Sequence, residues 1–178
     1  ASYTLPILPR FDFTWLGYSA LAGVVFGLAA WLFIALGHLQ ARYYQRWLPD
    51  ARWRGFLGGF LLLAIIWWFE PRRYLGLGLP VIEAAFESTQ LPYDFLLKIL
   101  FTTFTLAVGF KGGEVTPLFF IGATLGNALL WWIPMPLPLL AGLGFVAVFA
   151  GATNTPLACV VMGIELFGWP AAPYLAVA

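Results

Sequence analysis

The sequence predicts an all-α integral membrane protein with broken and tilted helices of unequal length. The first observation is composition: 62% of the residues are hydrophobic, 10% are charged and the mean hydropathy is +0.88, whereas about a quarter of the residues in soluble domains are charged. The second is that residues 115–164 contain no Asp, Glu, Lys, Arg or His. The third is that prolines cut this stretch into pieces of roughly fifteen residues, shorter than the ~20 residues that span a bilayer. These prolines are Pro117, Pro134, Pro136, Pro138 and Pro156.

Tryptophan placement agrees with a membrane protein. The chain has nine tryptophans, and many stand near the ends of apolar runs, as in the aromatic belts of the two membrane interfaces. The alternative, that they are ordinary core aromatics, stays open. The residues concerned are Trp15, Trp47, Trp53, Trp67, Trp68, Trp131 and Trp132.

Residues 15–39 form the first predicted element, a transmembrane helix that continues to about residue 47. The run carries no formal charge apart from His38 and is long enough to cross the bilayer with tilt. We expect His38 to be a hydrogen-bonded residue at the interfacial end of this helix rather than a ligand. Arginines then outnumber acidic residues, which places the following loop in the cytoplasm by the positive-inside rule. They are Arg42, Arg46, Arg52 and Arg54, against Asp50.

The next two elements are shorter. Residues 55–69 form a second apolar run, which Glu70-Pro71-Arg72-Arg73 stops. Residues 79–86 follow, with Glu83 and Glu87 four positions apart and therefore on one helical face. Two carboxylates can do acid/base chemistry, but a water-exposed face near the membrane surface is the favoured interpretation.

The remaining elements bring the expected total to about seven helices. Residues 93–110 form a helix in which Lys98 lies one turn from the start, where its ammonium can reach the interface. Three short segments follow: residues 117–133, 137–152 and 156–167. Pro117 and Pro156 are interpreted as helix starts, because proline in a first turn costs no hydrogen bond.

The most informative motif is Gly112-Gly113-Glu114-Val115-Thr116-Pro117. Two glycines allow backbone conformations that other residues avoid. The N–H groups of Glu114 to Thr116 lie at the positive end of the helix that follows, and the Thr116 hydroxyl adds a donor. The motif therefore predicts an anion-binding site.

These residues resemble the CLC family of chloride channels and anion/proton antiporters. Gly112-Gly113-x-x-x-Pro117 followed by Gly122-Ala123-x-x-Gly126 is similar to one family signature, and residues 150–157 and 163–168 are similar to two later segments. The resemblance implies the CLC inverted-repeat fold. It further implies that residues 1–178 are the second, C-terminal half of the transmembrane domain, truncated at both ends. The external gating glutamate and the central tyrosine of the family would then lie outside the chain.

The residues between Gly113 and Pro117 depart from the chloride-selective pattern. Glu114, Val115 and Thr116 resemble the fluoride-exporting branch, so the resemblance implies fluoride/proton antiport, with Gly112 to Thr116 in the ion pathway and Glu114 in proton coupling. Fluoride is small and strongly hydrated and needs hydrogen-bond donors to replace its water. A chloride channel or a chloride/proton antiporter remains the alternative, as does a structural ion pair between Glu114 and Lys111. An intramembrane enzyme that uses Glu114 is a remote alternative, since the chain has no catalytic dyad or metal-ligand spacing.

The resemblance also implies partners and location. CLC-like proteins are homodimers, and the apolar, small-residue stretch from Pro156 to about Tyr174 matches the family's interface. The expected partners are fluoride or chloride, protons, a second copy and the lipid bilayer, in the inner membrane of a prokaryote. No cofactor is expected, the lone Cys159 excludes an internal disulfide, and a net charge of +1 offers no case for nucleic acid. The interface residues expected are Pro156, Leu157, Cys159, Val160, Gly163 and Ile164.

Overall fold

The computed structural model of the chain describes residues 12–69 and 72–178. Within these ranges the protein is helical, and the segments differ in length as the sequence predicts. The elements are α1 (Phe13–Trp47), α2 (Ala51–Phe69), η1 (Arg72–Tyr74), α3 (Leu79–Glu87), α4 (Asp94–Ala107), α5 (Val115–Leu129), α6 (Leu137–Thr153), α7 (Pro156–Phe167), η2 (Trp169–Ala171) and α8 (Ala172–Val177). The predicted stop at Glu70 and Pro71 lies outside the described residues.

Local chemistry sets the ends of the first two helices. The Asp12 carboxylate accepts a hydrogen bond of 2.8 Å from the Thr14 N–H and so caps α1. α1 ends next to Pro49, which disfavours helical backbone in the preceding residue. The Asp50 carboxylate then accepts from the Arg52 N–H at 2.9 Å. α2 therefore begins at Ala51, before the apolar run that starts at residue 55, because the Asp50 carboxylate supplies a cap there.

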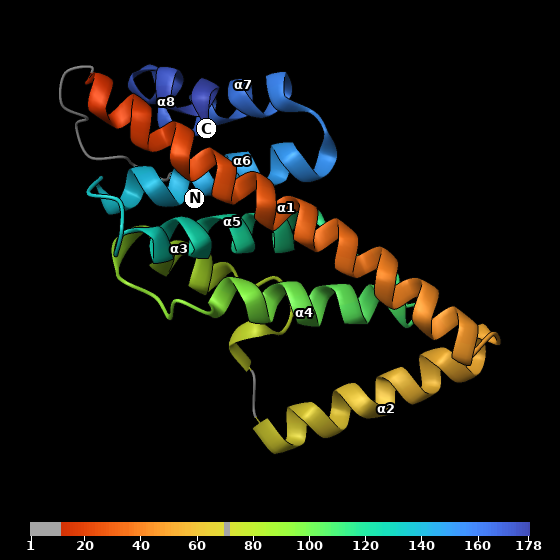
Figure 1. Cartoon of the computed structure of the whole chain (residues 1–178). Coiled ribbons are helices and arrows are strands. Elements are labelled where there is room, and N and C mark those ends of the chain that lie inside the picture. The colour runs from red at the N-terminus through yellow and green to blue at the C-terminus, as the bar shows by residue number, and fades with distance from the viewer. Residues whose placement is uncertain (1–11, 70–71) are drawn as a thin grey trace.

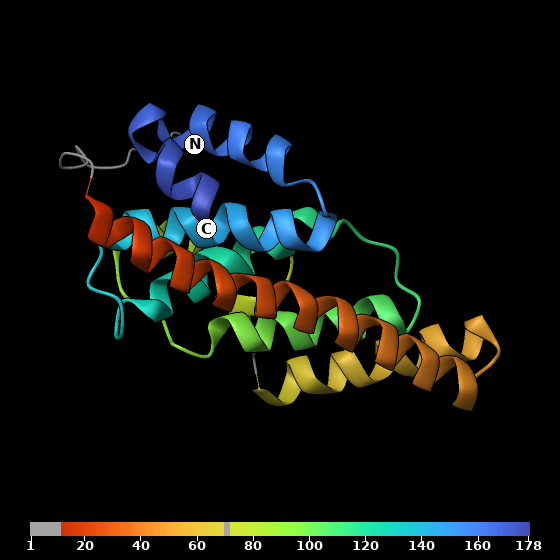
Figure 2. The same cartoon turned by 45° about the horizontal axis from the view of Figure 1, so that its top comes forward.

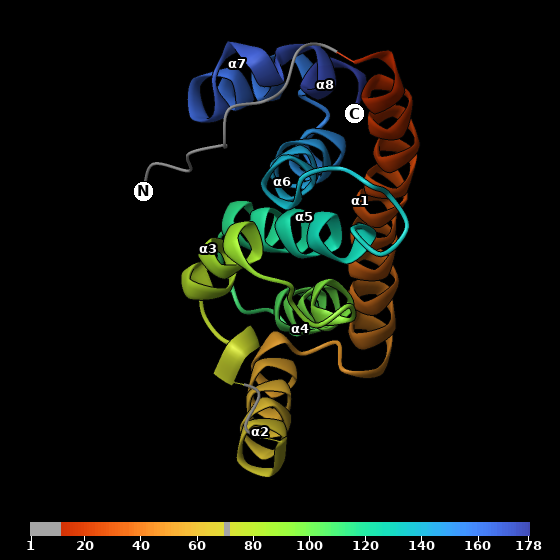
Figure 3. The same ribbon diagram turned by 90° about the vertical axis from the view of Figure 1, so that its left-hand side faces the viewer.

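The helices stack in layers. Figure 3 shows α7 with α8, then α6, α5, α4 and α2 in this order, while α1 runs along the side of the stack. Figures 1 and 2 show α1 crossing the other helices diagonally, with α2 at the outer edge. The Asp12 N–H donates to the Tyr174 hydroxyl at 3.1 Å, which ties the start of α1 to α8.

α5 and α6 form the centre of the stack through direct backbone contact. A Cβ atom on Gly122 would stand 2.1 Å from the carbonyl oxygen of Gly144, and one on Gly144 would stand 2.1 Å from that of Gly122. A Cβ on Gly126 would likewise meet the Leu140 carbonyl oxygen at 2.1 Å. Small residues allow this approach, which is how helices pack closely where lipid offers no hydrophobic driving force.

The surface of α1 is that of a membrane helix. One face packs on the protein through Ala22, Phe26 and Phe33, whereas Leu28 and Trp31 on the other face are 59% and 65% exposed. A helix that is apolar on both its packed and its open face suits a lipid environment. Within the described residues, α1 is the one helix long and apolar enough to cross a membrane unaided, with a mean hydropathy of 2.3 over its best window.

Candidate functional site

The glycine motif stands at the open end of a buried helix. α5 is buried from Pro117 to Leu129 except for the half-buried Phe119, while Glu114 and Val115 at its start are exposed and Thr116 is half-buried. Glu114 is the N-cap, its carbonyl oxygen accepts from the Leu118 N–H at 3.0 Å, and its carboxylate caps nothing. α5 begins at Val115, so the prediction that Pro117 begins the helix is displaced by two residues.

Two backbone donors at this end have no acceptor among the described residues. They are the N–H groups of Val115 and Thr116, since no helical carbonyl precedes them and proline at position 117 has no N–H. The positive end of the helix dipole lies at the same place. This end of α5 can therefore receive a small anion.

Gly112 and Gly113 act differently from the prediction. Neither has a positive φ, whereas Gly109 does, at 105°. A Cβ atom at position 112 or 113 would meet nothing within 4 Å. The turn out of α4 therefore uses the conformational freedom of Gly109, and the two motif glycines leave an open, unshielded backbone in front of α5.

Two cavities flank the motif. The first, which we call the Lys98 cavity, measures about 360 Å³ and lies among α2, η1, α4 and the motif. Its polar and backbone lining comes from Lys98, Thr102, Thr105, Lys111, Gly112 and Gly113. The second, the His38 cavity, measures about 230 Å³ and is lined by residues of α1 and α4 and by Glu114. Its polar lining is His38, Thr103 and Glu114.

Lys98 is a buried cation, and the prediction that it reaches the membrane interface is wrong. Its side chain is 2% exposed, and its ammonium donates to the carbonyl oxygens of Tyr74 at 2.9 Å and Gly76 at 2.8 Å. It also lies 5.0 Å from the centre of the Phe120 ring. The turn after η1 presents free carbonyls inward, and a buried charge is stabilised by such partners.

Among the residues that the structure describes, no carboxylate pairs with Lys98 or Lys111 of this cavity. Among the described residues the ion pair found is Arg73 with Asp94, at 2.8 Å, so the considered pair between Glu114 and Lys111 does not form. The Lys98 cavity is therefore cationic beside the two free N–H groups, and Glu114 faces the other cavity.

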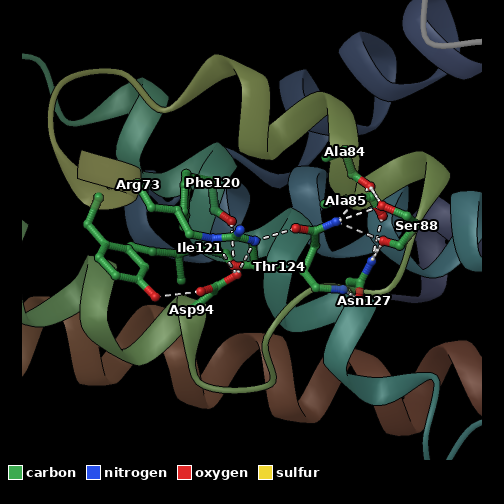
Figure 4. Close-up of polar contacts among 11 residues, drawn as sticks. Arg73, Ala84, Ala85, Ser88, Asp94, Phe120, Ile121, Thr124 and Asn127 are labelled. Carbon is green, nitrogen blue, oxygen red and sulfur yellow. Dashed lines mark hydrogen bonds and ion pairs between the residues drawn. The ribbon is translucent and has the colours of Figure 1, made fainter. Parts of the chain in front are cut away.

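A polar network joins α5 to the segments between η1 and the start of α4. Asp94, which is fully buried, accepts from the Arg73 guanidinium at 2.8 Å and from the Tyr74 hydroxyl at 2.6 Å. The Asn127 side chain donates to the carbonyl oxygens of Ala85 and Ser88, both at 2.8 Å. Figure 4 shows Arg73 with Asp94 and Asn127 with Ala85 and Ser88 in one region of the molecule. Sequence reasoning missed this network, although Asp94, Lys98 and Asn127 stand out as polar residues within apolar helices.

The remaining predicted residues lie away from the motif. Glu83 and Glu87 are exposed, as the favoured interpretation expects, and Glu165 is exposed as well. On α7, Pro156 and Leu157 are exposed and Val160 and Ile164 are partly exposed, but Cys159 and Gly163 are buried within the chain. Both positions lie on the helical face of α7 that packs on α6 and α8.

Comparison with known proteins identifies relatives. The sequence model of the voltage gated chloride channel family matches residues 2–178. A chloride/fluoride channel protein of Pseudomonas syringae pv. tomato is 48% identical over 163 residues, which cover 88% of this chain and 36% of that protein. An uncharacterized protein of Methanocaldococcus jannaschii is 34% identical over 118 residues, covering 62% of this chain and 29% of that protein.

A solved structure is similar over nearly the whole chain. The crystal structure of a CLC-type fluoride/proton antiporter superposes with a TM-score of 0.92 at 34% identity, covering 98% of this chain and 44% of that one. The chain thus spans less than half the length of each of these three relatives.

Proposed function

Because this chain belongs to the voltage gated chloride channel family, we propose that it forms the second half of the membrane domain of an anion transporter that exports fluoride in exchange for protons. Members of this family are integral membrane transporters. Two relatives named for fluoride support the choice of ion, and the cell membrane of a prokaryote is the proposed location.

The observation that carries the proposal is the open end of α5. Two unpaired N–H groups and the half-buried Thr116 lie there, next to residues that line the Lys98 cavity and next to the exposed Glu114. Fluoride is basic and strongly hydrated, so it gains from true donors more than chloride does. Gly112 and Gly113 keep the approach free of side chains.

Glu114 gives the site its proposed proton coupling. When protonated, its carboxyl group donates a hydrogen bond to the anion; when ionised, it competes with the anion for the same N–H groups. One group therefore exchanges the two ions. Ionisable side chains are rare within membrane domains and mark ion pathways there, which favours a functional role for the exposed Glu114.

Homodimerisation is also part of the proposal, through the exposed face of α7. Leu157 is 83% exposed and Val161 is 57% exposed, one helical turn apart. Two copies that bury this apolar stripe against each other would shield it within the assembly. Cys159 and Gly163 would support the stripe from inside the protomer.

The test is halide efflux from liposomes that contain the full-length protein, with proton flux followed in parallel. Glu114→Gln keeps a donor but cannot titrate, so proton-coupled fluoride efflux should fall sharply while the exposed control Glu83→Gln behaves as wild type. Thr116→Ala should weaken the binding of fluoride more than that of chloride, by about 1 kcal/mol or roughly fivefold, because one neutral hydrogen bond is lost. The control is Thr153→Ala, at an exposed position on α6.

Two outcomes would overturn the proposal. A wild-type protein that moves chloride readily and ignores fluoride would make the chloride alternative correct. Fluoride efflux and proton coupling that survive both site variants unchanged would remove the α5 site.

A further inference from the structure

His38 and Glu114 come from distant parts of the sequence and line the same cavity. His38 lies toward the end of α1, and Glu114 caps α5. They are the titratable residues among those that line this cavity, whose other walls are Phe33, Ile34, Gly37, Ala41, Thr103, Leu106 and Ala107. A proton-active group and the proposed coupling carboxylate, both of them exposed, thus line the same open, mostly apolar cavity.

The packing of α1 on α4 brings His38 there. A Cβ atom on Gly37 would stand 3.8 Å from the Thr103 methyl group, so the two helices approach closely one residue before the histidine. Ile34, Gly37, His38 and Ala41 recur at helical spacing, and the cavity therefore runs along one face of α1. At Ala41 the cavity reaches the part of α1 that carries Arg42 and Arg46.

The cavity is large enough for water and has groups that can hold it. Its volume of about 230 Å³ accommodates several water molecules, since one occupies about 30 Å³ in the liquid. The Thr103 hydroxyl donates to the Ile99 carbonyl oxygen at 2.8 Å, which leaves its own oxygen free to accept. His38 is exposed and has no hydrogen-bond partner among the described residues, so the expectation of a hydrogen-bonded histidine is wrong. Its ring remains free to bind such water.

We propose that His38 relays protons between Glu114 and the aqueous phase at the arginine-bearing end of α1. This inference rests on the proposed function. The protonated imidazole gives its proton through cavity water to the Glu114 carboxylate, which leaves neutral imidazole and a carboxylic acid. The imidazole then takes a proton from the aqueous phase. The same steps in reverse move a proton from Glu114 to that aqueous phase.

The surrounding charges suit a group that must change protonation. Histidine is the side chain that ordinarily titrates between pH 5 and 8. Arg42 follows one turn later on α1, while Lys98 of α4 and Lys111 line the other cavity. Glu114 is thus the one carboxylate among the residues that line the His38 cavity, and His38 is the other titratable residue of that lining.

The test compares His38→Ala and His38→Gln with Gln45→Ala in full-length protein in liposomes. Gln45 is exposed on the same helix and does not line the cavity, so its variant should behave as wild type. Both His38 variants should lose proton flux and coupled fluoride efflux by about tenfold or more, as expected when a positioned proton carrier is removed. The pH dependence of the remaining flux should differ from that of the wild type.

Imidazole in the buffer distinguishes a relay from a structural role. It should restore proton flux to His38→Ala, whose shortened side chain enlarges the cavity, and should leave Gln45→Ala unchanged. A loss of flux that imidazole does not restore would refute the relay, as would wild-type coupling and pH dependence in both His38 variants. If both His38 variants behave as the wild type and Glu114→Gln still abolishes coupling, the proposed function stands without His38. A wild-type protein that lacks fluoride/proton coupling would instead refute the proposed function.

Discussion

Asn127 is the polar residue whose removal should most clearly weaken the central stack. It is 2% exposed on α5 and makes three hydrogen bonds of 2.8 Å, one to α3 and two to the connection between α3 and α4. Its amide nitrogen donates to the carbonyl oxygens of Ala85 and Ser88, and its oxygen accepts from the Gln90 N–H. Asn127→Ala removes all three at once.

The size of the effect follows from these three bonds. Each neutral hydrogen bond contributes about 1 kcal/mol net, so the variant should lose about 3 kcal/mol of unfolding free energy. Ala85 is fully buried, so its carbonyl group would lose its hydrogen bond without gaining one to water. Ser88 is exposed, so its carbonyl group can bind water instead. At about 2–4 °C per kcal/mol, the melting temperature should fall by roughly 6–12 °C.

The assay is thermal unfolding of the full-length protein in detergent, with hydrogen exchange at the Gln90 amide as a local readout. Thr124→Val is the matched control, because this buried neighbour on α5 loses only bonds to carbonyls of its own helix. It should shift melting by less than half as much and leave Gln90 exchange unchanged. Equal melting temperatures for the two variants, or unaltered exchange at Gln90 in Asn127→Ala, would refute this account of the network.

Two further predictions concern packing and assembly. Gly122→Ala places a methyl group 2.1 Å from the Gly144 carbonyl oxygen, and it should lower the free energy of unfolding by about 1–3 kcal/mol or prevent folding. The control Gly27→Ala has open space around the new methyl group and should melt like the wild type. Equal melting temperatures for the two variants would show that α5 and α6 can separate. Leu157→Cys in a Cys159→Ser background should form a cross-linked dimer under oxidation, because position 157 is exposed and the buried Cys159 has been removed. If the protein forms dimers that never cross-link through α7, the interface lies elsewhere.

Several features of the fold were predictable because they depend on local composition. The apolar run from residue 15 predicts α1, since twenty-five residues without a formal charge exceed the span of a bilayer. Pro156 begins α7 as predicted, because its fixed backbone angle and missing N–H suit a first helical turn. The exposure of Glu83 and Glu87 follows from the cost of burying two carboxylates side by side.

Local patterns failed where a side chain found its partner in another segment. Lys98 was expected at the membrane interface, but the carbonyls of Tyr74 and Gly76 hold it inside. Asp94 reads as an ordinary helix start, yet it is fully buried against Arg73. The early start of α2 depended on a cap from Asp50, which the apolar pattern alone did not reveal.

The sequence by itself determined the family signature and the membrane character, because these depend on residue type and close spacing. For the same reason it yields the prediction of an anion site at the motif from Gly112 to Thr116. The tertiary structure alone decided that Glu114 shares a cavity with His38 while Lys98 and Lys111 line the opposite side. Helical periodicity shows which residues share a face of one helix. Which faces meet is set by the close backbone packing of α1, α4, α5 and α6, which brings together residues that no local pattern connects.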